Sequence, residues 1–124
     1  MQTKNFSISE SEWKVMKILW DRPNLSLKEI ASSLEDTDWS YTTIRTLVTR
    51  LLEKGAVTAD KTASNFLYRP AVSENECKRK EMNRFLSRVF DGSVSMMVST
   101  LTKDSNLTEE EQKELMSIIE KMKP

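Results

Sequence analysis

The sequence has no histidine and only one cysteine, Cys77, among its 124 residues. A disulfide framework, a Cys-x-x-Cys redox pair, a His/Cys zinc site and a Ser-His-Asp triad all need residues that are missing. Glycine is scarce as well, and neither Gly55 nor Gly92 belongs to a glycine-rich phosphate-binding motif. These absences predict a protein that is not an enzyme, holds no metal or cofactor and has no small-molecule substrate.

Long apolar runs are also missing, since none exceeds three residues. A membrane-spanning helix needs about 20 apolar residues, so none is predicted. A secretory signal needs an apolar segment shortly after the N-terminus, and the first residues of this sequence are not followed by one. We therefore expect a cytoplasmic protein. The length suits one domain or two very small ones, and the hydrophobic content of 38% supports folding.

The net charge is zero, with 19 basic and 19 acidic side chains, but the charges are unevenly distributed. Residues 40–69 carry five basic and two acidic groups, and residues 77–88 carry five basic groups and one acidic group. Binding of a polyanion depends on the local field, so the neutral total does not exclude nucleic acid. A basic segment taken alone is more often a solvated helix face.

Capping signals predict where the helices begin and end. A Ser/Thr-x-x-Glu capping box starts at Ser9, Ser26, Ser73 and Thr108, and Ser40 precedes a further helical pattern. Gly55 and Gly92 each follow an apolar periodic run, where a left-handed residue ends a helix. The predicted helices cover residues 10–20, 26–35, 40–54, 74–90, 94–102 and 109–122, and two short strands, 56–61 and 66–69, surround a polar turn at 62–65.

The predicted helix 40–54 has two different faces. Its apolar residues follow the i, i+3, i+4 spacing of a core-facing helix: Ile44, Leu47, Val48, Leu51 and Leu52. The opposite face is rich in threonine and arginine, although threonine is a poor helix former. Hydroxyls, methyls and guanidinium groups match phosphates, base edges and the thymine methyl. The alternative is a surface helix of unusual composition.

The order of elements favours the DNA-binding interpretation. Helix 26–35, a connection over 36–39 and helix 40–54 form a helix-turn-helix, and the hairpin after it is a wing. We predict a mainly α protein, with a winged helix-turn-helix DNA-binding domain over residues 1–72 and a three-helix dimerisation region over 73–124. The predicted DNA contacts are Tyr41, Thr42, Thr43, Arg45, Thr46, Thr49, Arg50, Lys54, Lys61 and Asn65.

Two segments, Ile8–Met16 and Trp39–Leu51, resemble the penicillinase-repressor family (BlaI/MecI type), and the resemblance extends from about residue 8 to residue 121. It implies a homodimeric bacterial transcriptional repressor that binds palindromic double-stranded operator DNA. It also implies a partner, a membrane metalloprotease sensor that responds to β-lactams and leads to cleavage of the repressor.

The sequence departs from the family pattern at two places. Thr43, Arg45, Thr46 and Arg50 match the recognition-helix positions of the family, but Tyr41 and Thr42 stand where members commonly have proline and lysine. The loss of a cation there predicts a different operator preference.

The second departure concerns proteolysis. The Asn-Phe dipeptide at which antibiotic-responsive members are cut is replaced here by Ser99-Thr100. The Asn-Phe pairs of this chain are Asn5-Phe6, near the start of the sequence, and Asn65-Phe66, in the wing; both lie far from that position. Control by the same cleavage is therefore not expected.

The last three helices each carry an apolar face too large for a three-helix unit of this size to bury by itself. Those faces pack either on the winged helix as one intramolecular core or on a second copy, and the two-fold symmetry of a palindromic site favours the second copy. A protein-interaction adaptor that keeps the winged-helix shape without reading DNA sequence is the alternative function. The predicted dimer-interface residues are Met82, Phe85, Leu86, Val89, Phe90, Met97, Leu101, Leu115, Ile118, Ile119 and Met122.

Overall fold

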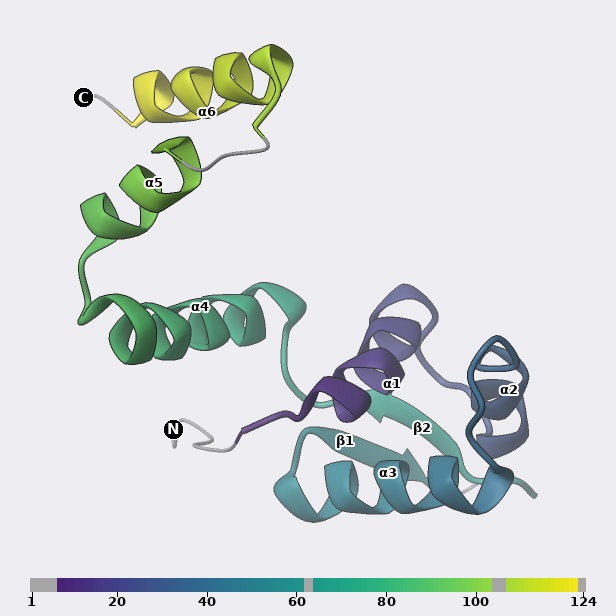
Figure 1. The fold of residues 1–124 in the computed structure, drawn as a ribbon. Helices are drawn as coiled ribbons and strands as arrows, with labels where there is room; N and C mark the ends of the chain where they lie inside the picture. The colour runs from purple at the N-terminus through teal and green to yellow at the C-terminus, as the bar shows by residue number, and fades with distance from the viewer. Residues whose placement is uncertain (1–6, 62–63, 104–106, 123–124) are drawn as a thin grey trace. The chain divides into compact units, whose positions relative to one another are not determined.

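The computed structural model describes residues 7–61, 64–103 and 107–122 (Figure 1). The chain divides into two compact units, residues 1–77 and 78–124, and each is described by itself. The predicted turn at 62–65 lies partly outside the described residues, because residues 62 and 63 are not among them. No helix in the described part of the chain is long and apolar enough to cross a membrane.

The first unit has the element order of a winged helix, as predicted. Three helices, α1 (Glu10–Asp21), α2 (Leu27–Ser32) and α3 (Tyr41–Lys54), precede the antiparallel strands β1 (Val57–Asp60) and β2 (Leu67–Pro70). The helices that follow are α4 (Glu74–Phe90), which begins in the first unit, α5 (Val94–Lys103) and α6 (Glu109–Lys121). The prediction of a mainly α chain with a wing is confirmed.

The capping boxes predicted at Ser9, Ser26 and Thr108 are present, and at Ser73 the hydroxyl oxygen accepts the N–H of Glu76 (3.1 Å). Ser9 accepts a hydrogen bond from the backbone N–H of Glu12 (3.2 Å), and Glu12 accepts one from the N–H of Ser9 (2.8 Å). The same reciprocal pair occurs at Ser26 and at Thr108. After the C-terminal ends of α3 and α4, Gly55 (φ 81°) and Gly92 (φ 83°) adopt the left-handed conformation. Local hydrogen bonding therefore sets these boundaries.

The end of α2 is the main error in the predicted elements, because the helix stops at Ser32 and not at residue 35. Beyond it the backbone forms tight i to i−3 bonds, with the N–H of Leu34 donating to Ala31 and that of Thr37 donating to Leu34 (3.0 Å each). Leu34 is buried there. The connection to α3 is therefore longer than the four residues predicted, and Leu34 is buried from this connection and not from the helix.

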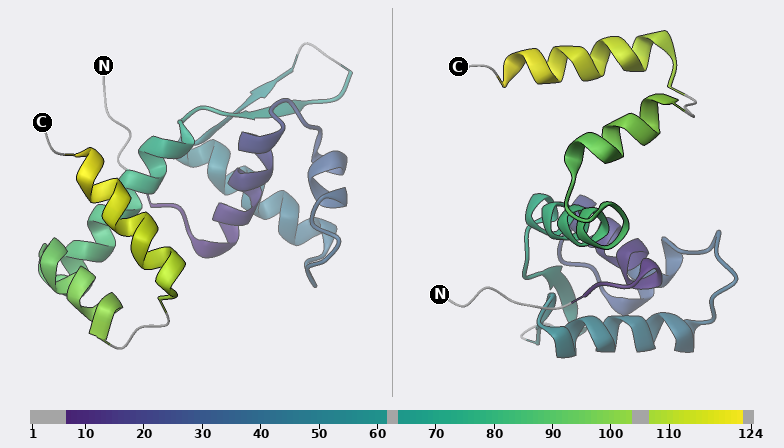
Figure 2. Two further views of the ribbon diagram at one scale, coloured as in Figure 1. Left: turned by 90° about the horizontal axis from the view of Figure 1, so that it is seen from above. Right: turned by 60° about the vertical axis from the view of Figure 1, so that its left-hand side comes forward.

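The hairpin is tied to the helices on two sides. Figure 2 (left) shows the two strands of the hairpin side by side. In their register, Val57 is opposite Pro70. The outer edge of β2 receives a bridge from the α1–α2 connection, because Tyr68 donates its N–H to Leu25 (2.7 Å) and accepts that of Leu25 (3.1 Å). After the hairpin, the indole N–H of Trp20 donates to the carbonyl of Val72 (2.9 Å). The wing is thus fixed to the same core that supports α3.

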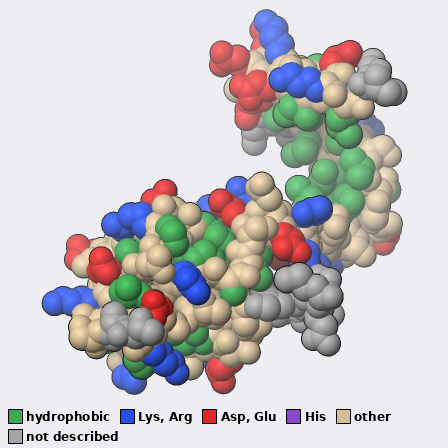
Figure 3. Space-filling view, turned by 180° about the vertical axis from the view of Figure 1, so that it is seen from behind, with side chains coloured by type: hydrophobic (Ala, Val, Ile, Leu, Met, Phe, Trp, Pro, Cys, Tyr) green, Lys and Arg blue, Asp and Glu red, His purple; other side chains and the backbone are tan. Residues whose placement is uncertain are grey.

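The second unit is organised differently. Among its described residues no side chain is fully buried, and α5 and α6 contain no buried residue. Phe85 and Phe90 of α4 contact each other edge to face, with ring centroids 5.8 Å apart. Figure 3 shows hydrophobic side chains gathered at the surface of this unit. The apolar faces predicted for these helices exist and remain largely exposed in a single chain.

Candidate nucleic-acid interface

Helix α3 separates a buried face from an exposed one. Ile44, Leu47, Val48 and Leu51 are buried against α1, α2 and the hairpin. The helix starts at Ser40, whose hydroxyl oxygen accepts the N–H of Thr43 (3.2 Å). All the residues that the sequence placed on the DNA-facing side of its first three turns are exposed: Tyr41, Thr42, Thr43, Arg45, Thr46, Thr49 and Arg50. The structure therefore brings these seven side chains together on one surface.

Two threonine hydroxyls on this surface are already engaged. Thr46 donates to the carbonyl of Thr42 (3.0 Å), and Thr49 donates to the carbonyl of Arg45 (2.9 Å). Their hydroxyl hydrogens are consumed within the helix, so the side chains present methyl groups and acceptor lone pairs outward. Such a surface suits the thymine methyl and the amino groups of cytosine and adenine in a major groove.

Glu53 limits the length of this surface. It is exposed and follows Thr49 by four residues, so it lies on the same side of α3 one turn later. A carboxylate at that place repels a phosphate. The surface suited to DNA is therefore the N-terminal three turns, which is the part of a recognition helix that contacts base edges.

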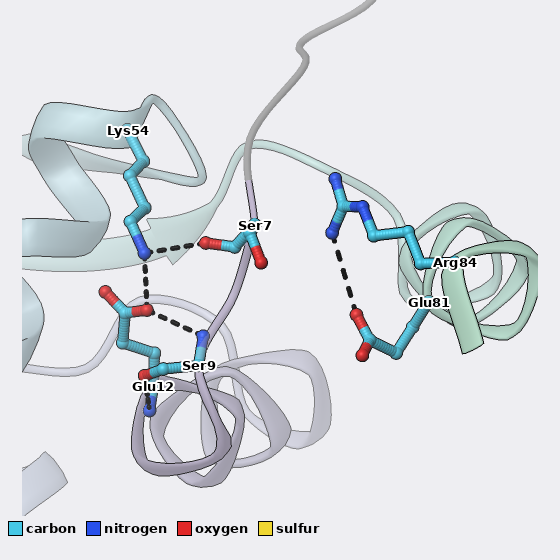
Figure 4. Close-up of polar contacts among 6 residues, drawn as sticks. All are labelled: Ser7, Ser9, Glu12, Lys54, Glu81 and Arg84. Carbon is cyan, nitrogen blue, oxygen red and sulfur yellow. Dashed lines mark hydrogen bonds and ion pairs between the residues drawn. The ribbon is translucent and has the colours of Figure 1, made fainter. Parts of the chain in front are cut away.

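Lys54, one of the predicted DNA contacts, has partners within the chain. Its ammonium group lies 2.5 Å from a carboxylate oxygen of Glu12 and donates to the carbonyl of Ser7 (2.6 Å; Figure 4). Glu12 is 1% exposed and Lys54 31%. The buried carboxylate holds the lysine at the end of α3, so a DNA phosphate would have to compete with Glu12 for the Lys54 ammonium group.

The wing carries polar and aromatic side chains at its surface. Lys61 and Asn65 are exposed, and the Lys61 ammonium lies 5.6 Å from the ring centre of Phe66, which is 49% exposed. Arg69 is exposed on β2 and donates to the hydroxyl of Thr58 (3.4 Å). Sequence reasoning missed Arg69, although its alternation with buried Tyr68 along the strand could have indicated it.

The predicted dimer-interface residues are exposed or half-buried in the described chain, as an unpaired interface would be.

Ser99 and Thr100, the predicted cleavage position, lie inside α5, where the hydroxyl of Thr100 donates to the carbonyl of Met96 (3.0 Å). A protease needs an extended segment, so cleavage there would require α5 to unfold locally.

Metal ligation has no candidate within residues 7–61, 64–103 and 107–122, where no group of three or more acidic or cysteine side chains could hold an ion. The one shared chemical feature of the α3 surface is a set of hydrogen-bonding, methyl and guanidinium groups on a rigid helix. Such an arrangement can bind and position a ligand through hydrogen bonds, methyl contacts and positive charge.

Comparison with known proteins agrees with this geometry. The family model described as "Penicillinase repressor" matches residues 8–121. The chain belongs to the penicillinase repressor family. It is 34% identical to the methicillin resistance regulatory protein MecI of Staphylococcus aureus strain N315, over 98% of this chain and 99% of MecI. It is 33% identical to the penicillinase repressor of Bacillus licheniformis, over 94% of this chain and 91% of that repressor.

A solved structure of the same family supports the fold. The first part of the chain is similar to the monomeric form of BlaI from Bacillus licheniformis, solved in solution in complex with the blaP half-operator. The TM-score is 0.52 at 34% identity, covering 61% of this chain and 93% of that one. The family match therefore rests on both sequence and winged-helix architecture.

Proposed function

We propose that this protein is a homodimeric bacterial transcriptional repressor that binds palindromic operator DNA through α3 and the wing. The observation that carries the proposal is the composition of the α3 surface. In the first three turns of this helix, every side chain outside the core is a threonine, an arginine or a tyrosine. The relatives are themselves named as repressors, and one family structure contains operator DNA. Repression would follow from occupying promoter DNA, which places the protein in the cytoplasm.

Within this proposal the contacts have different roles. Arg45, Thr43 and Thr46 lie nearest the bases and select sequence, while Arg50 and Lys61 hold phosphates together with Asn65 of the wing. Residues 73–124 form the dimerisation domain, and the two copies place their recognition helices on two half-sites. A membrane metalloprotease sensor is a further proposed partner, although Ser99-Thr100 argues against cleavage at the family's position.

A binding selection tests the proposal. Duplexes selected by the full-length protein from a random pool should contain two inverted half-sites about one helical turn apart or a multiple of it. Binding should weaken steeply as salt rises. Selected duplexes with a single half-site, or no enrichment at all, would contradict the proposal; the second result would favour the adaptor, which keeps the fold without reading DNA.

The wing supplies one testable phosphate contact. Lys61→Ala should weaken binding to all duplexes by a similar factor and reduce the slope of log K against log salt by about one for each wing. The expectation follows because an exposed ammonium near a phosphate adds affinity without reading bases. Titrations at several salt concentrations measure it, and Lys103→Ala, exposed on α5, is the matched control. A loss confined to one sequence would contradict the phosphate assignment.

The exposed apolar face of α6 supplies a test of dimerisation. Ile118 is 58% exposed, so Ile118→Asp should leave the monomer folded and prevent pairing. Sedimentation should then report a monomer, and operator affinity should fall roughly 100-fold because two linked half-site contacts become one. Ser117→Asp, on the opposite side of α6, is the control and should stay dimeric. A dimeric Ile118→Asp protein would remove this face from the interface.

A further inference from the structure

Helix α4 carries a row of cations that the proposed function does not use. Lys80, Arg84 and Arg88 follow one another at i, i+4 and i+8. At about 100° per residue, their positions fall within ~80° around the helix. Arg88 is exposed, and Lys80 and Arg84 are half-exposed. We refer to these three side chains as the α4 basic row.

The basic row lies opposite the apolar face of the same helix. Met82, Phe85 and Val89 are exposed on that apolar face, which the proposed function assigns to the dimer. Ser87 and Glu81, neither of them apolar, flank the basic row, and buried Cys77 lies on the same side of the helix one turn before Lys80. The helix thus has one face for hydrophobic packing and another whose main property is positive charge.

We propose that the α4 basic row contacts the phosphate backbone of DNA flanking each half-site. The cations of the row follow one another about every 6 Å along the helix, and a DNA strand has one phosphate per ~3.4 Å of axis. Successive cations are therefore spaced by about two phosphates of one strand. Protein interfaces are centred on apolar or aromatic anchors, which this face lacks, whereas DNA-binding surfaces are polar and positive. The inference rests on the proposed function, because it adds a second surface to the same DNA-bound dimer.

The acidic neighbour of the row does not prevent this contact. Glu81 pairs with Arg84 at 3.6 Å, and both side chains are exposed by more than a third (Figure 4). An exposed pair at this distance is weak, so a phosphate can replace the carboxylate as the partner of the guanidinium group.

The test compares two duplexes and two matched variants of the full-length protein. The first duplex is the minimal operator obtained by selection, and the second carries one further turn, about 10 base pairs, at each end. One variant combines Lys80→Gln, Arg84→Gln and Arg88→Gln. The other removes three exposed lysines of α5 and α6, with Lys103→Gln, Lys113→Gln and Lys121→Gln.

The wild-type protein should bind the extended duplex more tightly and with a steeper salt dependence. The α4 variant should lose that difference. Its slope of log K against log salt on the extended duplex should fall by at least about 2, whereas six phosphate-bound cations in a dimer would contribute a slope of ~5 at most. Its binding to the minimal duplex should not change, and the α5/α6 variant should behave as wild type on both.

Three results would overturn the inference: no change on the extended duplex, an equal loss on both duplexes, or an equal loss in the α5/α6 variant. Arg88→Gln alone, at an exposed position, gives the same comparison if the triple variant does not fold. Failure of the proposed function is distinguishable, because the wild-type protein would then bind neither duplex.

Discussion

Replacement of Glu12 by alanine should lower the free energy of unfolding by about 3 kcal/mol, the low end of the range for breaking a buried ion pair, because its partner Lys54 is partly exposed. The carboxylate accepts hydrogen bonds from Lys54 and from the N–H of Ser9 through one oxygen. The other oxygen is buried and has no partner within the described chain. Loss of the side chain therefore removes a helix cap and the link between α1 and the end of α3 together.

Glu29→Ala is the matched control for this effect. Glu29 occupies the same position in the capping box of α2, where it accepts the N–H of Ser26 (3.0 Å), but it is exposed. Urea unfolding should show a clearly smaller loss of unfolding free energy for Glu29→Ala than for Glu12→Ala. Equal losses would mean that Glu12 acts only as a cap and that its pairing with Lys54 contributes nothing.

Acidic pH should remove the stabilisation that the Glu12 carboxylate provides. Burial raises the pKa of Glu12, but the hydrogen bonds from Lys54 and Ser9 outweigh it, so the pKa of this carboxyl lies below its ordinary value. The stabilisation is complete above the pKa of an unfolded glutamate, about 4.3, and is lost as the pH falls through the lower pKa of the folded state. The difference in unfolding free energy between wild type and Glu12→Gln should therefore shrink in that acidic range.

The sequence was sufficient for features that depend on local hydrogen bonds. The capping boxes at Ser9 and Ser26 and the left-handed glycine Gly55 were predicted correctly, because each involves residues a few positions apart. The two faces of α3 were predicted for the same reason, since helical spacing alone decides which side chains share a side.

Features that depend on distant residues were not predictable in this way. Glu12 and Lys54 are 42 positions apart, and nothing in their spacing indicates that folding brings them together. From the sequence alone, Lys54 is therefore assigned to DNA with no indication of its ion pair with Glu12. The end of α2 was also predicted wrongly, because the apolar spacing of Ile30 and Leu34 continues beyond Ser32, where the helix ends.

Arg45 is the residue on which the DNA-reading proposal depends most. It is exposed near the middle of α3, with Thr42, Thr46 and Thr49 on the same side. A guanidinium group in that position matches the two acceptors of guanine in the major groove, and a good contact of this kind discriminates between bases by about 1–3 kcal/mol. Arg45→Ala should therefore affect sequence preference as well as affinity.

The most direct measurement is a titration of wild type, Arg45→Ala and the exposed-lysine control Lys113→Ala against the selected operator and single-base variants of it. Arg45→Ala should weaken operator binding roughly 5- to 100-fold for each half-site, and it should bind the operator and one of its base variants almost equally. Lys113→Ala should behave as wild type. An Arg45→Ala protein with unchanged operator affinity and unchanged preference among the variants would contradict the assignment of α3 as the recognition helix.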